Sequence, residues 1–271
     1  RQLESGDYAA AWASNAKALE LRPHDDDTER QQIAIAKQWL QNARIGSGGG
    51  PSSFAQLVTP LEEVLTARAI KASGAERADI EAHIAWARFL RSRDSGRPPE
   101  IDAPIQAALR VDPENAVAHA VKGFWLIWSG GPLPDARQAF DKAIAATGGD
   151  TAFADRLVLS AWLNRARSKE DYALGAVEYA SRLLRRGRPL GDSATHTALL
   201  VACYEDGLRD RAYLGRLAGL LVPTDHVALL EILGQKADRE DPRRAADALR
   251  AFFLERTGNT AEARRIYEAI L

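Results

Sequence analysis

The chain has 271 residues, of which 46% are hydrophobic and 27% charged, and its formal net charge is −1 at pH 7. This length and composition are typical of a globular protein with a sizeable core, and a nearly neutral chain lacks the broad positive field that drives nucleic-acid binding. A single cysteine, Cys203, excludes an internal disulfide framework and a metal site built from several cysteines.

Apolar residues recur three and four positions apart along almost the whole chain, which predicts amphipathic helices. The clearest segments, in chain order, are QQIAIAKQWLQNA, PLEEVLTARAI, DIEAHIAWARFL, PIQAALRV, ARQAFDKAIAA, TALLVACY and ARRIYEAIL. Thr59-Pro60-Leu61-Glu62 has the pattern of a helix start. No segment alternates convincingly with a period of two, so we predict an all-α fold. No stretch approaches 18 consecutive apolar residues, so we expect no membrane insertion within this chain.

A spacing of small residues recurs along these helices. Its members are Gly6 with Ala11, Gly131 with Ala136, Gly207 with Ala212 and Gly258 with Ala263, and Ser168 with Ala173 keeps the interval without glycine. The steps from 131 to 168 and from 168 to 207 are 37 and 39 residues, a period typical of stacked helical repeats. We interpret the glycines as helix ends with positive φ and the alanines as points of close helix approach, with Phe140 or Tyr267 filling the gap.

The segments GDYAAAWASNAKALELRP, AALRVDPENAVAHAVKGFWLIWSGG and TGNTAEARRIYEAI resemble tetratricopeptide (TPR) repeats. The resemblance implies helix–turn–helix units of about 34 residues, stacked as antiparallel pairs into a right-handed superhelical solenoid. We expect about six irregular pairs in a single domain over residues 1–271. Residues 1–23 resemble the second half of a repeat, so we expect its first half upstream. We expect a flexible loop at 45–53 and an irregular segment with an extra helix at 222–242.

Histidine and cysteine positions do not form a metal-ligand or catalytic motif. His83, His119 and His196 occupy similar places in the first helices of their pairs, where the family has a bulky residue, so we expect them to pack between helices. We expect His24 and His226 in loops, facing solvent. The acidic run HDDDTE at 24–29 is explained by helix capping, with a calcium site as the alternative.

Cys203 follows His196 by seven residues, about 10.5 Å along a helix, which is too far for a direct hydrogen bond. We therefore expect Cys203 to be buried and inert. An activated thiol or a histidine site would make the chain an enzyme. The sequence favours the opposite hypothesis, with no enzymatic activity, no cofactor and no metal.

Aromatic and cationic residues on the first helices form the candidate partner-binding surface, because these helices line the concave face in TPR proteins. The candidates are Arg88, Arg91, Phe124, Trp128, Trp162, Arg165, Tyr204, Phe252 and Arg256. Together they would suit a peptide with apolar and acidic groups. The alternative for each is that the aromatic rings belong to the core and the arginines to the solvated surface. The Lys and Asn clamp with which some TPR proteins bind a terminal carboxylate is not found here.

We therefore predict a non-enzymatic protein–protein interaction scaffold that binds a partner peptide or helix in a concave groove. The alternative is a regulatory or assembly module of a larger membrane-anchored or multidomain protein, in secretion, envelope or complex biogenesis. The Ala- and Arg-rich composition is typical of a bacterial, GC-rich genome. The sequence leaves open the partner's identity, homo-oligomer formation, and a cytoplasmic or periplasmic location, with or without an N-terminal tether.

Overall fold

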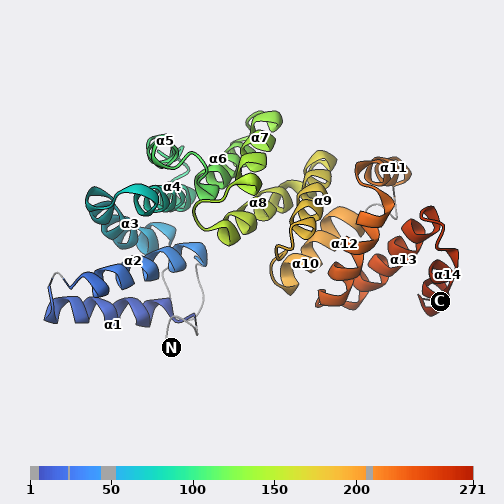
Figure 1. Cartoon of the computed structure of the whole chain (residues 1–271), viewed down its shortest axis with the longest axis horizontal. Helices are drawn as coiled ribbons and strands as arrows, with labels where there is room; N and C mark the ends of the chain where they lie inside the picture. The colour runs from blue at the N-terminus through green and yellow to red at the C-terminus, as the bar shows by residue number, and fades with distance from the viewer. Residues whose placement is uncertain (1–5, 24, 44–52, 206–209, 271) are drawn as a thin grey trace. The chain divides into compact units, whose positions relative to one another are not determined.

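The computed structural model describes residues 6–23, 25–43, 53–205 and 210–270. These residues hold 14 α-helices and one π-helical segment, η1, and no strand (Figure 1). The helices are α1 (Tyr8–Leu21), α2 (Asp26–Gln41), α3 (Phe54–Lys71), α4 (Gly74–Ser95), α5 (Asp102–Val111), α6 (Ala116–Ser129), α7 (Leu133–Ala145), α8 (Thr151–Ala166), α9 (Glu170–Arg185), α10 (Ser193–Leu199), η1 (Leu200–Tyr204), α11 (Arg211–Leu220), α12 (Pro223–Lys236), α13 (Glu240–Arg256) and α14 (Thr260–Ile270). The predicted all-α class is confirmed.

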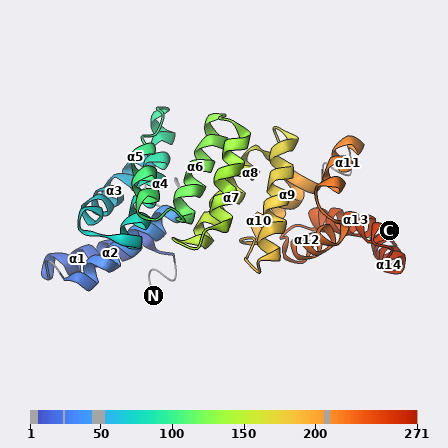
Figure 2. The ribbon, with the colours of Figure 1, turned by 45° about the horizontal axis from the view of Figure 1, so that its top comes forward.

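The chain divides into two compact units, Arg1–Ala154 and Asp155–Leu271, and the boundary falls within α8. In the first unit, α1 packs on α2, α3 on α4, and α6 on α7, while α4 also contacts α5 and α6 (Figure 2). In the second unit, α12 packs on α13 and α13 on α14. From α1 to α7 each helix therefore contacts the next one in sequence, whereas in the second unit α10 contacts α12 and α11 contacts α9. Part of the predicted loop at 45–53 lies outside the described residues, and α12 lies within the segment 222–242.

Short polar side chains cap several helix starts. Asp7, Ser53, Asn115 and Asp192 each accept a hydrogen bond from a backbone N–H in the first turn of the helix that follows. The helix start expected at Thr59-Pro60 was wrong, because Ser53 caps α3 at Phe54 and Pro60 lies inside that helix. The hydroxyl of Thr59 instead donates to the carbonyl of Ala55 at 2.8 Å.

Glycines with positive φ lie at the ends of α6 and α13. Gly130, with φ of 74°, ends α6, whereas the spacing pointed to Gly131. The N–H of Gly131 donates to the carbonyl of Leu126 at 2.8 Å, so both glycines take part in the end of the helix. Gly258 also has positive φ, at 85°, directly after the residue that caps α13.

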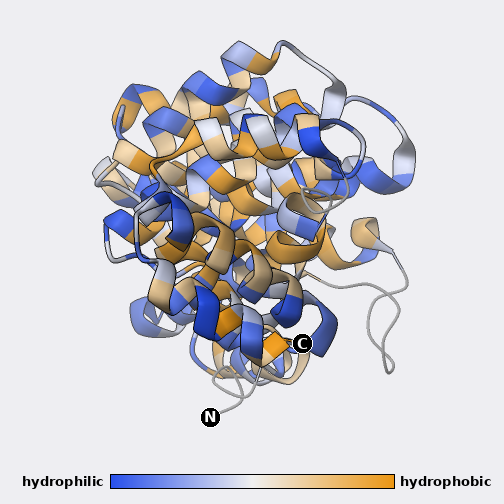
Figure 3. Cartoon of the chain, turned by 90° about the vertical axis from the view of Figure 1, so that its right-hand side faces the viewer, coloured by the Kyte–Doolittle hydropathy of each residue, from blue (hydrophilic) through white to orange (hydrophobic). Residues whose placement is uncertain are grey.

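Small residues mark where helices approach each other. The alanines of the predicted spacing at 11, 136, 173 and 263 are buried, whereas Ala212 is exposed in the first turn of α11. The closest approaches use two glycines that the spacing did not include: a Cβ at Gly123 would collide with the ring of Phe140, and one at Gly175 with the ring of Trp162. Figure 3 shows hydrophobic and hydrophilic residues interspersed along individual helices, as expected for helices with one buried face.

Candidate functional site

Five aromatic residues on α4 and α6 form a continuous cluster in the first unit: Trp86, Phe89, Phe124, Trp125 and Trp128. Phe89 is at its centre, with ring centroids 5.2 Å from Trp86, 5.1 Å from Phe124 and 5.6 Å from Trp128. These separations are those of favourable aromatic pairs. The cluster runs from buried rings in the core to Trp128, which is 39% exposed. We call this cluster the aromatic column, and its Trp128 end lies at the protein surface.

An arginine lies beside the exposed end of this column. The guanidinium carbon of Arg93 is 4.7 Å from the ring centroid of Phe54 and 5.5 Å from that of Trp128, within cation–π range of both. A carboxylate oxygen of Asp94 accepts a hydrogen bond from the backbone N–H of Ala55 at 2.7 Å and joins the end of α4 to the start of α3. We call Phe54, Arg93 and Trp128 the Trp128 surface.

Two of the predicted arginines form ion pairs with a buried carboxylate. Arg88 and Arg91 on α4 contact the side chain of Glu62 on α3 at 2.8 and 2.7 Å. Arg88 also donates to the backbone carbonyl of Glu100 at 3.1 Å. Glu62 is buried, so its charge requires these partners. These arginines therefore hold α3 against α4.

The other predicted residues divide between core and surface. Phe124, Trp162 and Tyr204 are buried in the core, Arg165 is exposed at the end of α8, and Phe252 is half-buried beneath the guanidinium of Arg256, whose carbon lies 4.2 Å from the ring centroid. Four of the candidates lie in the first unit, Arg88, Arg91, Phe124 and Trp128, and the rest in the second.

Sequence reasoning missed Phe54 and Arg93. The available signal for Arg93 was its position four residues after Phe89 on the same predicted helix, which places the two on one face. Phe54 directly follows the glycine-rich segment, and its closeness to Arg93 depends on packing between two helices, which local spacing does not predict.

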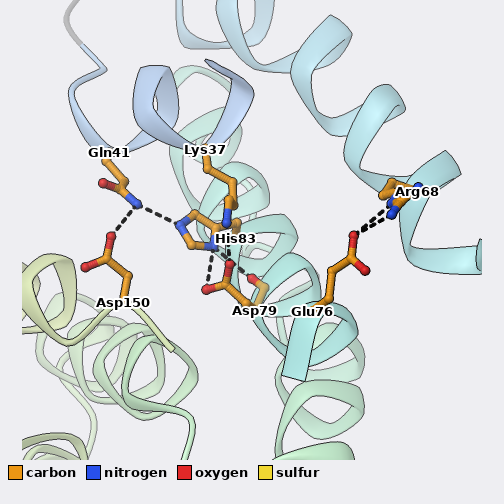
Figure 4. Close-up of polar contacts among 7 residues, drawn as sticks. All are labelled: Lys37, Gln41, Arg68, Glu76, Asp79, His83 and Asp150. Atoms are coloured by element: carbon orange, nitrogen blue, oxygen red, sulfur yellow. Dashed lines mark hydrogen bonds and ion pairs between the residues drawn. The ribbon is translucent and has the colours of Figure 1, made fainter. Parts of the chain in front are cut away.

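A partly buried polar network surrounds the buried His83 in the first unit (Figure 4). The side-chain nitrogen of Gln41 lies 3.0 Å from Nε2 of His83 and 3.0 Å from a carboxylate oxygen of Asp150. Because this amide nitrogen is a donor, Nε2 of His83 is the acceptor, and Nδ1–H donates to the carbonyl of Asp79 at 2.8 Å. Burial lowers the pKa of His83, which favours the neutral ring. Lys37 contacts Asp79 at 2.6 Å, so the network joins α2, α4 and the segment before α8.

The histidine predictions have mixed outcomes. His83, His119 and His196 are buried, which confirms their expected packing. The solvent-facing loop predicted for His226 was wrong, because this residue is buried in α12 and stacks on Phe253 with centroids 4.1 Å apart. His24 lies outside the described residues.

Both ring nitrogens of His226 have hydrogen-bond partners. Nε2 lies 2.9 Å from the carbonyl of Leu217, and Nδ1 lies 3.3 Å from the hydroxyl of Tyr204. Cys203 is buried in η1, as expected, and its backbone carbonyl accepts a hydrogen bond from the hydroxyl of Tyr213 at 2.6 Å. This cluster is a packed core of the second unit.

Among the described residues, no group of three or more His, Cys, Asp and Glu side chains is arranged to hold a metal ion. Over the same ranges no single helix has the length and apolarity to cross a membrane, and α11 and α12 meet that criterion only jointly, across a bend of 105°. Comparison of the sequence with models of known protein families and with curated proteins finds no match.

Proposed function

We propose that this chain is a non-enzymatic, TPR-like solenoid scaffold that binds a segment of a protein partner at the Trp128 surface. The observation that carries the proposal is the exposed end of the aromatic column: Trp128 is 39% exposed, whereas its neighbours Phe89 and Phe124 are buried. Tryptophan and arginine are the residue types most enriched among interface residues that dominate binding energy. The architecture we propose is about six helix pairs in a right-handed superhelix, and the packing of α1 on α2, α3 on α4 and α6 on α7 supports its paired character.

The chemistry of the surface defines the partner segment. The exposed part of Trp128 offers an apolar contact that requires little ordering, because Phe89 and Phe124 already fix the ring. Arg93 adds a planar donor for a carboxylate. The matching segment carries a large apolar side chain followed or preceded by an acidic residue. Arg88 and Arg91 support this surface through Glu62 and are not counted among its contacts.

Trp128→Ala is expected to weaken partner binding by about 2 kcal/mol, or roughly 30-fold in Kd, because it removes the apolar anchor. Arg93→Glu is expected to weaken it further for an acidic partner, because like charges then face each other. A partner is first isolated with the intact protein, and its Kd for each variant is then measured by calorimetry.

The matched control is Arg264→Glu, a charge reversal of an exposed arginine on α14 in the second unit. It should leave the Kd unchanged. Arg88→Glu is a poor test, because it would place a second carboxylate beside buried Glu62 and so probe folding. An unchanged Kd in both Trp128→Ala and Arg93→Glu would overturn the assignment of this surface.

A further inference from the structure

A separate pocket lies between the first three helices, away from the Trp128 surface. Its volume is about 540 Å³, within the range of ligand sites in proteins. Each helix contributes residues from one face. The lining comprises Trp12, Ala16, Leu19 and Glu20 of α1, Glu29, Gln32 and Ile33 of α2, and Val64, Ala67, Arg68 and Lys71 of α3. Alanines on both α1 and α3 leave room between these two helices.

The pocket is charged at one end. Glu20 lies in the last turn of α1, Glu29 in the first turn of α2, and Arg68 and Lys71 in the last turn of α3. The contacts of Arg68 and Lys71 with Glu29 show that these helix ends meet. The body of the pocket is apolar, with the indole of Trp12 and the aliphatic residues of all three helices. Inside it, buried Gln32 accepts a hydrogen bond from the amide of Asn15.

The two cations at the charged end have unused hydrogen-bonding capacity. Lys71 Nζ and Arg68 Nη1 lie 3.7 and 3.9 Å from the same carboxylate oxygen of Glu29, beyond hydrogen-bond distance. Arg68 uses Nε and Nη2 on Glu76 at 2.8 Å (Figure 4). Lys71 has a side chain that is 62% exposed and, within the described ranges, no closer acidic partner. A carboxylate entering this end would meet two cationic donors.

We propose that this pocket binds a small amphipathic carboxylic acid, with its apolar chain along Trp12, Ile33 and Val64 and its carboxylate between Arg68 and Lys71. The ligand carboxylate would accept the hydrogen bonds that Glu29 is too distant to accept. Glu20 and Glu29 line the same end and oppose an anion, so their charges lower the affinity that the two cations provide. A cationic amphiphile would be favoured at this end only if the negative charges of Glu20 and Glu29 outweighed the positive charges of Arg68 and Lys71.

The test compares decanoate, decanol and decyltrimethylammonium, each titrated into the full chain by calorimetry below its micellar concentration. Decanoate is expected to bind at least tenfold more tightly than either of the other two. Lys71→Met should remove most of this preference, and Glu20→Gln should strengthen decanoate binding. Lys17→Met is the matched control, because Lys17 is an exposed lysine on α1 that does not line the pocket. It should leave decanoate binding unchanged.

Ala67→Trp should block all three compounds, because the new ring fills the space between α1 and α3. Lys71→Met changes an exposed side chain, so the test of charge does not depend on whether Ala67→Trp folds. No binding of decanoate to the wild-type chain would overturn the proposal. So would binding of decyltrimethylammonium as tight as that of decanoate, or an equal loss in Lys17→Met and Lys71→Met.

Discussion

Replacing Phe140 with alanine is expected to lower the free energy of unfolding by about 3–5 kcal/mol. Phe140 lies on α7, is fully buried, and packs its ring directly against Gly123 on α6. Because Gly123 has no side chain, nothing on that face of α6 can fill the cavity that the substitution leaves. Urea-induced unfolding followed by circular dichroism should show a lower midpoint.

The same contact is testable from the other helix. A Cβ added at Gly123 would lie 3.0 Å or less from three atoms of the Phe140 ring. Gly123→Ala is therefore expected to destabilise the chain, since the overpacking cost of about 1–3 kcal/mol exceeds the gain of about 1 kcal/mol from replacing a helical glycine. In a Phe140→Ala background, Gly123→Ala should become neutral or stabilising, because the collision is gone.

Gly215→Ala is the matched control for this substitution. Gly215 is a glycine in α11, and a Cβ there would meet no atom within 4 Å. This variant should gain up to about 1 kcal/mol, because only the helix preference changes. If Gly123→Ala were as stabilising as Gly215→Ala, the close approach of α6 and α7 would be contradicted.

These contacts show what sequence periodicity predicts and what it leaves undetermined. The spacing of apolar residues depends on single helices, so it was sufficient for the all-α class. The spacing also selected Phe140 as the residue that fills a gap between helices. It did not select Gly123, because the collision depends on a ring from the next helix. The start of α3 was misplaced for a related reason: a proline inside a helix resembles a proline at its start when only the local sequence is considered.

Candidate site residues show the same division. Residue type and helical position identified Trp128, the exposed end of the aromatic column. They could not separate Arg88 from Arg93, since the difference is the buried carboxylate of Glu62, which lies 26 residues earlier on another helix. The charged end of the pocket between α1, α2 and α3 also arises from three segments, so no local motif marks it.

Acidification is expected to reveal two opposing titrations in the second unit. Burial lowers the pKa of His226 from 6.5 to about 4. As pH falls from 6.5 to 4, the unfolded state takes up this proton first, so His226 removes stability at about 1.4 kcal/mol per pH unit. Burial raises the pKa of Asp155 from 3.8 to about 6, although Arg188 lies 2.7 Å away. The stabilising contribution of the Asp155 carboxyl is fully present below pH 3.8 and is lost as the pH rises through 6. Acidification therefore adds stability through Asp155 and removes it through His226.

Two substitutions separate these contributions through the slope of unfolding free energy against pH between 4 and 6. His226→Gln should make the acid-induced loss of stability shallower than in the wild type, because it removes the group that the unfolded state protonates first. Asp155→Asn should make the loss steeper, because it removes the compensating carboxyl while the amide oxygen can still accept from the hydroxyl of Tyr179. The slopes are compared, and not the absolute free energies of unfolding, since each substitution also changes stability at neutral pH. A steeper loss in His226→Gln, or a shallower one in Asp155→Asn, would show that burial does not control these two groups.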